Sequence, residues 1–243
     1  MLEIPLPHFN ERKTPVDTLV LHATAHETCE EVVACLDRIK LSSHYILGID
    51  GTLCRCVSEE NRAWHAGLGS WREIKTDMNS HSVGIEICNP GLGQIPFTEA
   101  QFEKLIPFCK KIIRKHQIKP QYIIAHSDMA PTRKPDPGIA FPWKRLAKEG
   151  IGLWYQPRNA EKVLTNDVAE LLSSIGYNTE NQENTIAAAY AFRRHFLPEE
   201  VAVDENIGHL VENVYPIGKT GLLEGAKFLK TLKAVAYSYQ TAG

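Results

Sequence analysis

The chain has 243 residues, 43% of them hydrophobic, so it can bury a substantial core as one large domain or two smaller ones. Its formal net charge of −2 gives no sign of a nucleic-acid surface, and we expect no nucleic-acid partner. No apolar run approaches the roughly 20 residues that a membrane span requires, so we expect none.

The N-terminus and the cysteines bear on the compartment. The opening MLEIPLPHFNERK lacks the basic start and apolar centre of a signal peptide. The six cysteines are irregularly spaced, and apolar neighbours of Cys35, Cys88 and Cys109 favour reduced, buried thiols. We therefore expect a cytoplasmic protein. The alternative is the periplasm or cell envelope, if a leader precedes this sequence or export is non-classical.

The first elements in chain order alternate between strand and helix. Residues 18–21 (TLVL) predict an apolar strand, and His22 follows at its end. Residues 27–41 carry one apolar stripe behind a capping box, which predicts a helix packed on the sheet. Residues 45–57 predict a hairpin with an Asp-Gly turn. We interpret His44, which precedes the hairpin, as a structural histidine.

The next segment, AWHAGLGSWREI, is a loop rich in glycine and aromatic residues. Such a loop is a plausible wall for a ligand, with Trp64 and His65 as the contacting residues. The alternative is that Trp64 and Trp71 only cover the core.

Residues 83–88 predict a strand that contains one carboxylate, Glu86. Strand alternation turns Glu86 away from the larger apolar set, and an unpaired buried carboxylate is costly. Glu86 is therefore either exposed at an edge or held at a site. Asn89 follows the strand, and FTEAQFEKLIPFCKKIIRKH then predicts an amphipathic helix capped by Thr98.

A second strand-end histidine lies further along the chain. His126 follows the apolar run QYIIA, and Asp136 lies between two prolines that hold its loop extended. Two such strands ending side by side would bring His22 and His126 together, with Asp136 folded over them. Two imidazoles and one carboxylate leave a fourth position open for water, as in a catalytic zinc site. Capping, turn or surface roles are the alternative for this histidine and aspartate.

FPWKRLAKEG predicts a short closing helix, and the character of the sequence changes after GLWYQPRN. Residues 164–191 predict two helices separated by a polar turn, and GLLEGAKFLKTLKAVAYS predicts a third. We therefore predict two domains. Residues 1–157 form an α/β domain with a central mixed β-sheet flanked by helices, and residues 158–243 form a small all-α three-helix module.

Five ordered motifs, LHAT, SSHYILGIDGTL, AWHAG, HSVGIEICN and AHSDMAPTRKPDPG, resemble the zinc-dependent N-acetylmuramoyl-L-alanine amidases of the type 2 family. That family includes cell-wall recycling amidases, phage lysozymes and peptidoglycan recognition proteins. The resemblance covers about residues 15–147. It implies hydrolysis of the bond between N-acetylmuramic acid, in its ordinary or 1,6-anhydro form, and L-alanine of peptidoglycan or muropeptides. It also implies one zinc ion per chain, held by His22, His126 and Asp136.

The resemblance implies further roles. Glu86 matches the glutamate that takes a proton from the attacking water in recycling-type amidases. Lys134, two residues before Asp136, would stabilise the oxyanion. The substrate-binding candidates are His65, Trp64, Asn89 and Arg133.

The helical part resembles a three-helix peptidoglycan-binding module through its Ile-Gly-Tyr turn, the run AFRRHF and Pro198. It departs from that module at Arg193, where glutamine is usual, and after Pro198. A packing or dimerisation role is the alternative.

Two functions stay open: a zinc amidase, and a peptidoglycan recognition protein of the same fold without hydrolysis. Pure binders of the family lack the metal triad, which is complete here, so the pattern favours the enzyme. The absence of HExxH ranks an unrelated zinc hydrolase lower. Whether the substrate is a soluble 1,6-anhydromuropeptide or the intact wall, and which oligomer forms, is left open.

Overall fold

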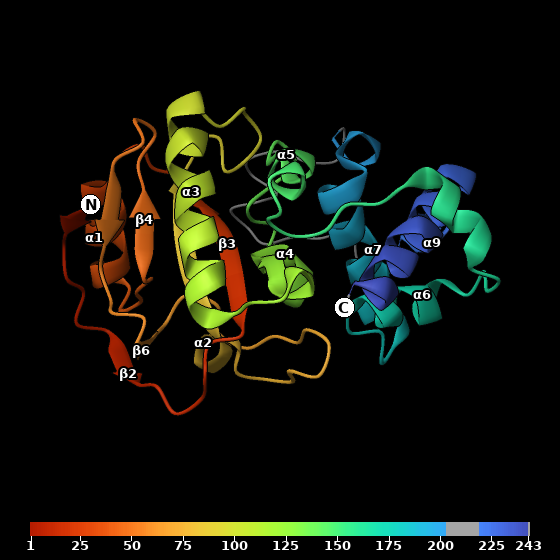
Figure 1. Cartoon of the computed structure of the whole chain (residues 1–243), viewed down its shortest axis with the longest axis horizontal. Helices are drawn as coiled ribbons and strands as arrows, with labels where there is room; N and C mark the ends of the chain where they lie inside the picture. The colour runs from red at the N-terminus through yellow and green to blue at the C-terminus, as the bar shows by residue number, and fades with distance from the viewer. Residues whose placement is uncertain (203–218, 243) are drawn as a thin grey trace.

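The computed structural model describes residues 1–202 and 219–242, and its centre is a six-stranded sheet in the order β1-β5-β4-β7-β3-β8 (Figure 1). Strands β3, β4, β7 and β8 are parallel, whereas β5 is antiparallel to β4. The strands are β1 (Leu2–Glu3), β3 (Thr18–Thr24), β4 (Tyr45–Leu47), β5 (Leu53–Arg55), β7 (Ser82–Cys88) and β8 (Ile123–Ala125). The predicted mixed sheet and the β4–β5 hairpin are confirmed. A second, two-stranded sheet pairs β2 (Phe9–Glu11) with β6 (Asn61–Ala63).

Helix α3 (Glu99–His116) covers one face of the large sheet and lies in front of it in Figure 1. It begins at Thr98 in the predicted capping box. Its apolar stripe packs against the residues of β3 and β7 that alternation directs to this side. These include Leu19, Leu21, Val83, Ile85 and Ile87 from the strands and Phe102, Leu105, Cys109 and Ile112 from the helix.

The opposite face has two apolar regions with a polar strip between them. Helix α1 (Cys29–Arg38), capped as predicted, packs over β4 and β5 through Cys29 and Val32. The other region, around Val20 and Ile124, is covered by residues from the C-terminal helices. His22 and Glu86, paired in register across β3 and β7, lie on the strip between them.

Two boundaries near the histidines differ from the prediction. Strand β3 does not end before His22 but continues to Thr24, because β7 pairs with it over its whole length. His126 opens a short helix, α4 (His126–Met129), rather than a loop. The remaining short elements are α2 (Met78–His81), α5 (Trp143–Lys148), and the 3-10 turns η1 (Pro120–Tyr122), η2 (Pro157–Lys162), η3 (Pro198–Glu200) and η4 (Thr220–Leu223).

Three helices, α6 (Val168–Ile175), α7 (Gln182–Phe196) and α9 (Ala226–Thr241), make up most of the C-terminal part that the structure describes. Figure 1 shows them gathered beside α4 and α5, away from α1. Their apolar core is continuous with Val20, Ile124 and Trp71 of the sheet side. The domain boundary between residues 157 and 158 stays a prediction. The diverged stretch after Pro198 lies mostly outside the described residues.

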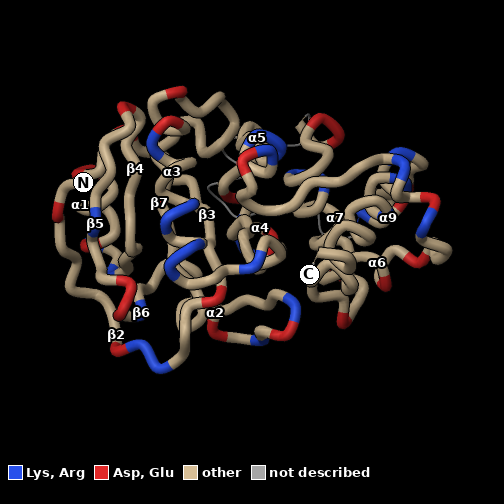
Figure 2. Tube along the Cα trace, in the orientation of Figure 1, with Lys and Arg blue, Asp and Glu red and all other residues tan. Residues whose placement is uncertain are grey.

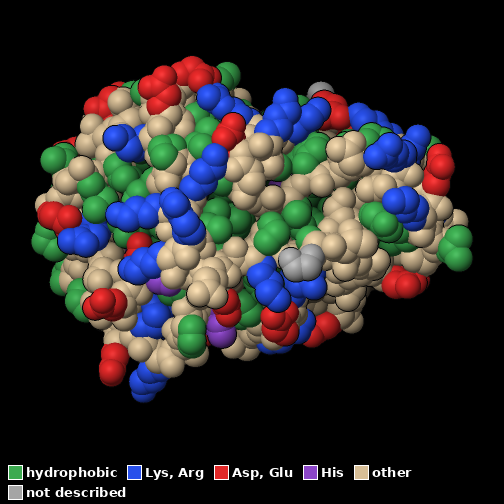
Figure 3. All heavy atoms as spheres, in the orientation of Figure 1, with side chains coloured by type: hydrophobic (Ala, Val, Ile, Leu, Met, Phe, Trp, Pro, Cys, Tyr) green, Lys and Arg blue, Asp and Glu red, His purple; other side chains and the backbone are tan. Residues whose placement is uncertain are grey.

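The surface carries charges of both signs. Figure 2 shows basic and acidic residues interspersed along the chain, and Figure 3 shows their side chains interspersed over one face, in keeping with the net charge of −2. All six cysteines are free, as predicted, and five are buried; Cys35, predicted to be buried, is only half-buried. The compartment stays a prediction. Among the described helices, none combines the length and apolarity needed to cross a bilayer.

Candidate active site

Three elements bring His22, His126 and Asp136 together. His22 lies on β3, His126 follows the adjacent strand β8, and Asp136 returns on the loop after α4. Their ligand atoms all lie within 4.8 Å of one another. The two Nδ1 atoms are 2.9 Å apart, and each is 3.1 Å from Asp136 Oδ2. The structure therefore joins the three residues that the sequence analysis singled out.

The hydrogen bonds of the outer ring nitrogens show whether this group suits a cation. His126 Nε2 lies 3.1 Å from the carbonyl oxygen of Ala66. Because a carbonyl only accepts, Nε2 carries a proton, and in the neutral form of the ring, which is the form that binds metals, Nδ1 presents a lone pair to Asp136. In that form a lone pair and a carboxylate oxygen lie 3.1 Å apart with no proton between them, an arrangement that suits a cation. Two imidazole nitrogens and one carboxylate oxygen are ligands that zinc accepts.

The ionisation states also suit a metal. Burial, and next the charge of His126, lowers the pKa of His22 to about 4, so its ring is neutral at pH 7. Burial alone would raise the pKa of Asp136, but the neighbouring His126 and His22 hold that pKa well below its usual range. The site therefore offers a neutral histidine and an anionic carboxylate, the forms that bind metals.

Glu86 faces the same point from β7. Its Oε1 is 3.9 Å from His22 Nδ1. Burial, reinforced by the charge of Asp136, raises the pKa of Glu86 to about 8, and the positive charge of Lys134 partly offsets the increase. A carboxyl group with a pKa near neutrality can both accept and donate a proton at physiological pH.

The predicted substrate-binding residues lie in different surroundings. Trp64 donates its indole N–H to Asn10 Oδ1 at 2.7 Å, and the ring of His65 lies 2.9 Å from His22 Nε2. The Asn89 amide holds its own loop, since its Oδ1 accepts from the backbone of Gly91 and Gly93. The substrate-binding roles of these residues stay predictions.

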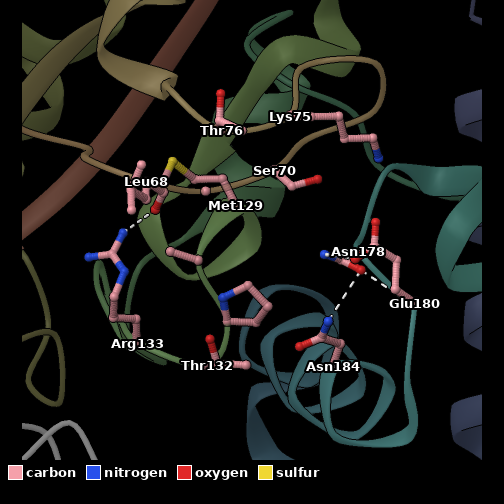
Figure 4. A pocket seen from close by; sticks show the side chains of 13 residues that line it. Leu68, Ser70, Lys75, Thr76, Met129, Thr132, Arg133, Asn178, Glu180 and Asn184 are labelled. Atoms are coloured by element: carbon pink, nitrogen blue, oxygen red, sulfur yellow. Dashed lines mark hydrogen bonds between the residues drawn. The ribbon is translucent and has the colours of Figure 1, made fainter.

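Arg133, the fourth candidate, lines an open cleft of about 400 Å³ beside the loop that joins His126 to Asp136. The lining comes from residues 68–70 and 75–76, from residues 129–133, and from three residues between 178 and 184. Figure 4 shows Arg133 and Leu68 on one side of this cleft and Asn178 and Asn184 on the other. Nothing in the sequence indicated that the C-terminal part contributes to a cleft this close to the proposed ligands.

Asp128 is a buried residue near the site that the sequence did not point to. It is 1% exposed and lies two positions after His126. Its Oδ2 accepts from the Ala125 backbone at 2.9 Å and from His195 at 2.8 Å, and its Oδ1 accepts from the Tyr177 hydroxyl at 2.7 Å. Asp128 therefore ties the start of α4 to the C-terminal helices.

Comparison with known proteins agrees with these observations. Residues 12–139 match the family model described as N-acetylmuramoyl-L-alanine amidase. The chain is 34% identical over 212 residues to the N-acetylmuramoyl-L-alanine amidase AmiD of Escherichia coli K12, and the match covers 75% of each protein. It is 37% identical over 108 residues to the 1,6-anhydro-N-acetylmuramyl-L-alanine amidase AmpD of Enterobacter cloacae, covering 44% of this chain and 56% of the relative.

Solved structures extend the similarity to almost the whole chain. The complex of E. coli AmiD with anhydro-N-acetylmuramic acid-L-Ala-D-γ-Glu-L-Lys superposes with a TM-score of 0.75 at 30% identity, covering 93% of this chain and 90% of that one. AmpDh3 of Pseudomonas aeruginosa, in complex with an anhydromuramic pentapeptide, superposes with a TM-score of 0.71 at 26% identity, covering 95% and 94%.

Proposed function

Because this chain belongs to the N-acetylmuramoyl-L-alanine amidase family, and is such an amidase, we propose that it performs the hydrolysis with one zinc ion held by His22, His126 and Asp136. The observation that carries the zinc assignment is the convergence of these three ligand atoms within 4.8 Å, beside Glu86. The bond that breaks joins the lactyl carbonyl of N-acetylmuramic acid to the nitrogen of L-alanine.

The residues around the site have distinct tasks in this mechanism. Zinc held there supplies Lewis-acid polarisation of the carbonyl and of the attacking water. Glu86 accepts the proton that water loses as its oxygen adds to the carbonyl carbon, and then gives it to the alanine nitrogen as the C–N bond breaks. Lys134 stabilises the negative charge that develops on the carbonyl oxygen. The products are a carboxylate and a free amine.

We propose that the substrate is a muropeptide, because two relatives with the same fold were solved with anhydromuropeptides bound. The peptide of the AmiD complex contains D-γ-Glu, which carries a free carboxylate. Arg133 is exposed and lines the cleft beside the ligand loop. A guanidinium at that position suits a carboxylate of the stem peptide, which supports the substrate-binding role of Arg133.

We also propose that residues 1–157 form the catalytic domain and residues 158–243 a peptidoglycan-binding-like helical domain. The family match ends at residue 139, and the elements described after η2 are all helical. Arg193, which departs from the resemblance, is 5% exposed and donates to the carbonyls of Leu222 and Glu224 at 2.9 Å each. That position therefore joins α7 to the segment before α9, which favours a packing role for Arg193.

The test measures hydrolysis and metal together. Purified protein should release the stem peptide from a soluble 1,6-anhydromuropeptide, lose this activity to a chelator and regain it with zinc. Elemental analysis should find one zinc per chain in the parent and in His81→Ala, a control at a half-buried histidine of α2 paired with Asp17, and little in His126→Ala.

Two outcomes would contradict this proposal, and a parallel assay identifies the preferred substrate. Full zinc in His126→Ala would show that the ligand assignment is wrong. Zinc and muropeptide binding without hydrolysis would favour a recognition protein instead. Running intact sacculi beside the soluble substrate shows which of the two the enzyme prefers.

A further inference from the structure

Two consecutive residues of the AWHAG motif contact both histidine ligands on the side away from Asp136. The ring of His65 lies against His22, with His65 Nδ1 2.9 Å from His22 Nε2. The carbonyl oxygen of Ala66 lies 3.1 Å from His126 Nε2. One short segment therefore meets the outer nitrogen of each ligand.

The hydrogen bonds behind His65 determine which of its nitrogens carries the proton. The Ser82 hydroxyl donates its only proton to the carbonyl oxygen of Met78 at 2.6 Å. Ser82 Oγ, 3.3 Å from His65 Nε2, must then accept, so the proton of the neutral His65 ring lies on Nε2. His65 Nδ1 is left as an acceptor, and among the described residues the donor that it faces is His22 Nε2–H. Consequently His22 Nδ1 presents its lone pair toward Asp136.

The fold holds His65 in this place by two further devices. Gly84 on β7 leaves room for the ring, because a Cβ atom at Gly84 would lie 2.4 Å from His65 Nδ1. The Asn79 side-chain oxygen accepts from three successive backbone N–H groups, those of His65 (3.0 Å), Ala66 (2.7 Å) and Gly67 (3.1 Å). His65 is 8% exposed, and both of its ring nitrogens are engaged within the protein.

We propose that His65 is a positioning residue, which through the chain Met78–Ser82–His65 fixes the tautomer and orientation of His22 so that its Nδ1 binds the metal. Outer partners of metal-binding histidines are commonly carboxylates, carbonyls or water, and here the partner is a second imidazole. This inference rests on the proposed zinc site and assigns His65 to the metal rather than to the substrate.

The first test compares His65→Leu with His65→Asn. Leucine fills much of the space but cannot accept from His22, whereas the Asn side-chain oxygen can take the place of Nδ1. Competition with a chelator should show zinc bound about 10–100-fold more weakly by His65→Leu, and most of the affinity restored in His65→Asn. The ¹⁵N shifts of His22 in the metal-free protein should report a proton on Nε2 in the parent and a mixture of tautomers in His65→Leu.

The second test examines the role of His65 without replacing it, in case His65→Leu does not fold. Ser82→Ala removes the acceptor for His65 Nε2. Ser43→Ala is its matched control, because both serines are fully buried but the Ser43 hydroxyl donates to the carbonyl oxygen of Gly84 and makes no hydrogen bond to Met78, Ser82 or His65. Zinc affinity should fall in Ser82→Ala and stay at the parent value in Ser43→Ala.

The outcomes are distinguishable from a failure of the proposed function. A parent protein that binds no zinc overturns the zinc site itself. A parent that binds zinc, with affinity unchanged in a folded His65→Leu or in Ser82→Ala, overturns only the role of His65.

Discussion

At the scale of single residues, surroundings rather than residue type decide what each carboxylate of the site does. Asp136 faces two histidine rings, which hold its pKa well below the usual range despite burial. Glu86 lies 3.9 Å from one of those rings with its side chain 12% exposed, and its pKa rises to about 8, first through desolvation and next through the charge of Asp136. One carboxylate is therefore an anion suited to binding a metal, and the other can exchange a proton.

Replacement of Glu86 or Lys134 should impair turnover without loss of metal. Removing a positioned acid–base group costs about 10²–10⁴ in rate, so Glu86→Gln should lower kcat by that factor. Lys134→Ala should lower kcat by roughly 10²–10³ through loss of oxyanion stabilisation. The measurement is kcat on a soluble muropeptide, with zinc content in the same samples and Lys148→Ala, at an exposed lysine of α5, as the control. A loss of less than about tenfold removes the residue concerned from the mechanism.

Glu59 should make stability depend on pH below about 4.5. Burial by itself would raise its pKa, but hydrogen bonds from Lys115 (2.6 Å), Tyr45 (2.5 Å) and His116 (2.6 Å) outweigh burial and lower the pKa to about 2. Because the folded-state pKa lies below the ordinary value of 4.5, the contribution is complete above pH 4.5 and lost as the pH falls toward 2. Its size is about 3 kcal/mol.

Urea unfolding from pH 2 to 6 checks this expectation against Glu59→Gln, which cannot titrate. The free energy of unfolding of the parent should fall by about 3 kcal/mol more than that of the variant across this range. Parallel curves for the two proteins would show that Glu59 is not the group responsible.

At the scale of elements, strand β7 serves both faces of the sheet by alternation. Val83, Ile85 and Ile87 face α3, whereas Gly84 and Glu86 face the site. The strand can carry the proposed catalytic carboxylate because its other face supplies the apolar packing. The glycine is required on the site face because His65 occupies the space that a side chain would fill.

Substitution of Gly84 should therefore disturb the metal site from within a strand. A Cβ atom at Gly84 would lie 2.4 Å from Nδ1 and 2.5 Å from Cγ of His65, so Gly84→Ala must displace the ring. We expect a loss of roughly 1–3 kcal/mol in stability from overpacking, together with weaker zinc binding. Gly221→Ala is the control, because a Cβ there meets nothing within 4 Å. Urea unfolding and chelator competition give both quantities, and parent-like values for Gly84→Ala would refute the steric argument.

At the scale of the whole molecule, the C-terminal helices and the site side of the sheet share one core. One buried cluster includes Val20 and Ile124 of the sheet, Trp71 of the loop between β6 and α2, and Leu172 and Phe192 of the helices. The helices also reach the ligand loop through Asp128, which accepts from Tyr177 and His195. The described helices therefore support the segment that carries His126, whether or not they also bind peptidoglycan.

A chain ending at Arg158 tests whether the two proposed domains are separable. Because truncation exposes several large apolar side chains, each worth about 1.5–3 kcal/mol when buried, we expect a marked loss of stability in urea and a broader transition. Cooperative unfolding at the midpoint of the full-length protein would instead show an independent catalytic domain, as the change in sequence texture at residue 158 predicts.

The amino-acid sequence by itself determined the local elements and pointed to the proposed ligand set. Apolar runs ending in His22 and His126, a proline-braced Asp136 and the capping boxes of α1 and α3 are short-range patterns, and the structure reproduces the elements and brings the three ligand residues together. Only the tertiary structure decided that His65 lies behind His22, 43 residues away, and that Tyr177 reaches Asp128 across 49 residues. Those contacts depend on how distant segments pack and on which buried polar atoms must find partners, and neither is encoded in local propensity or periodicity. The shared core of sheet and helices could not be predicted for the same reason, since an apolar helix face indicates that the face is buried but not which surface it packs against.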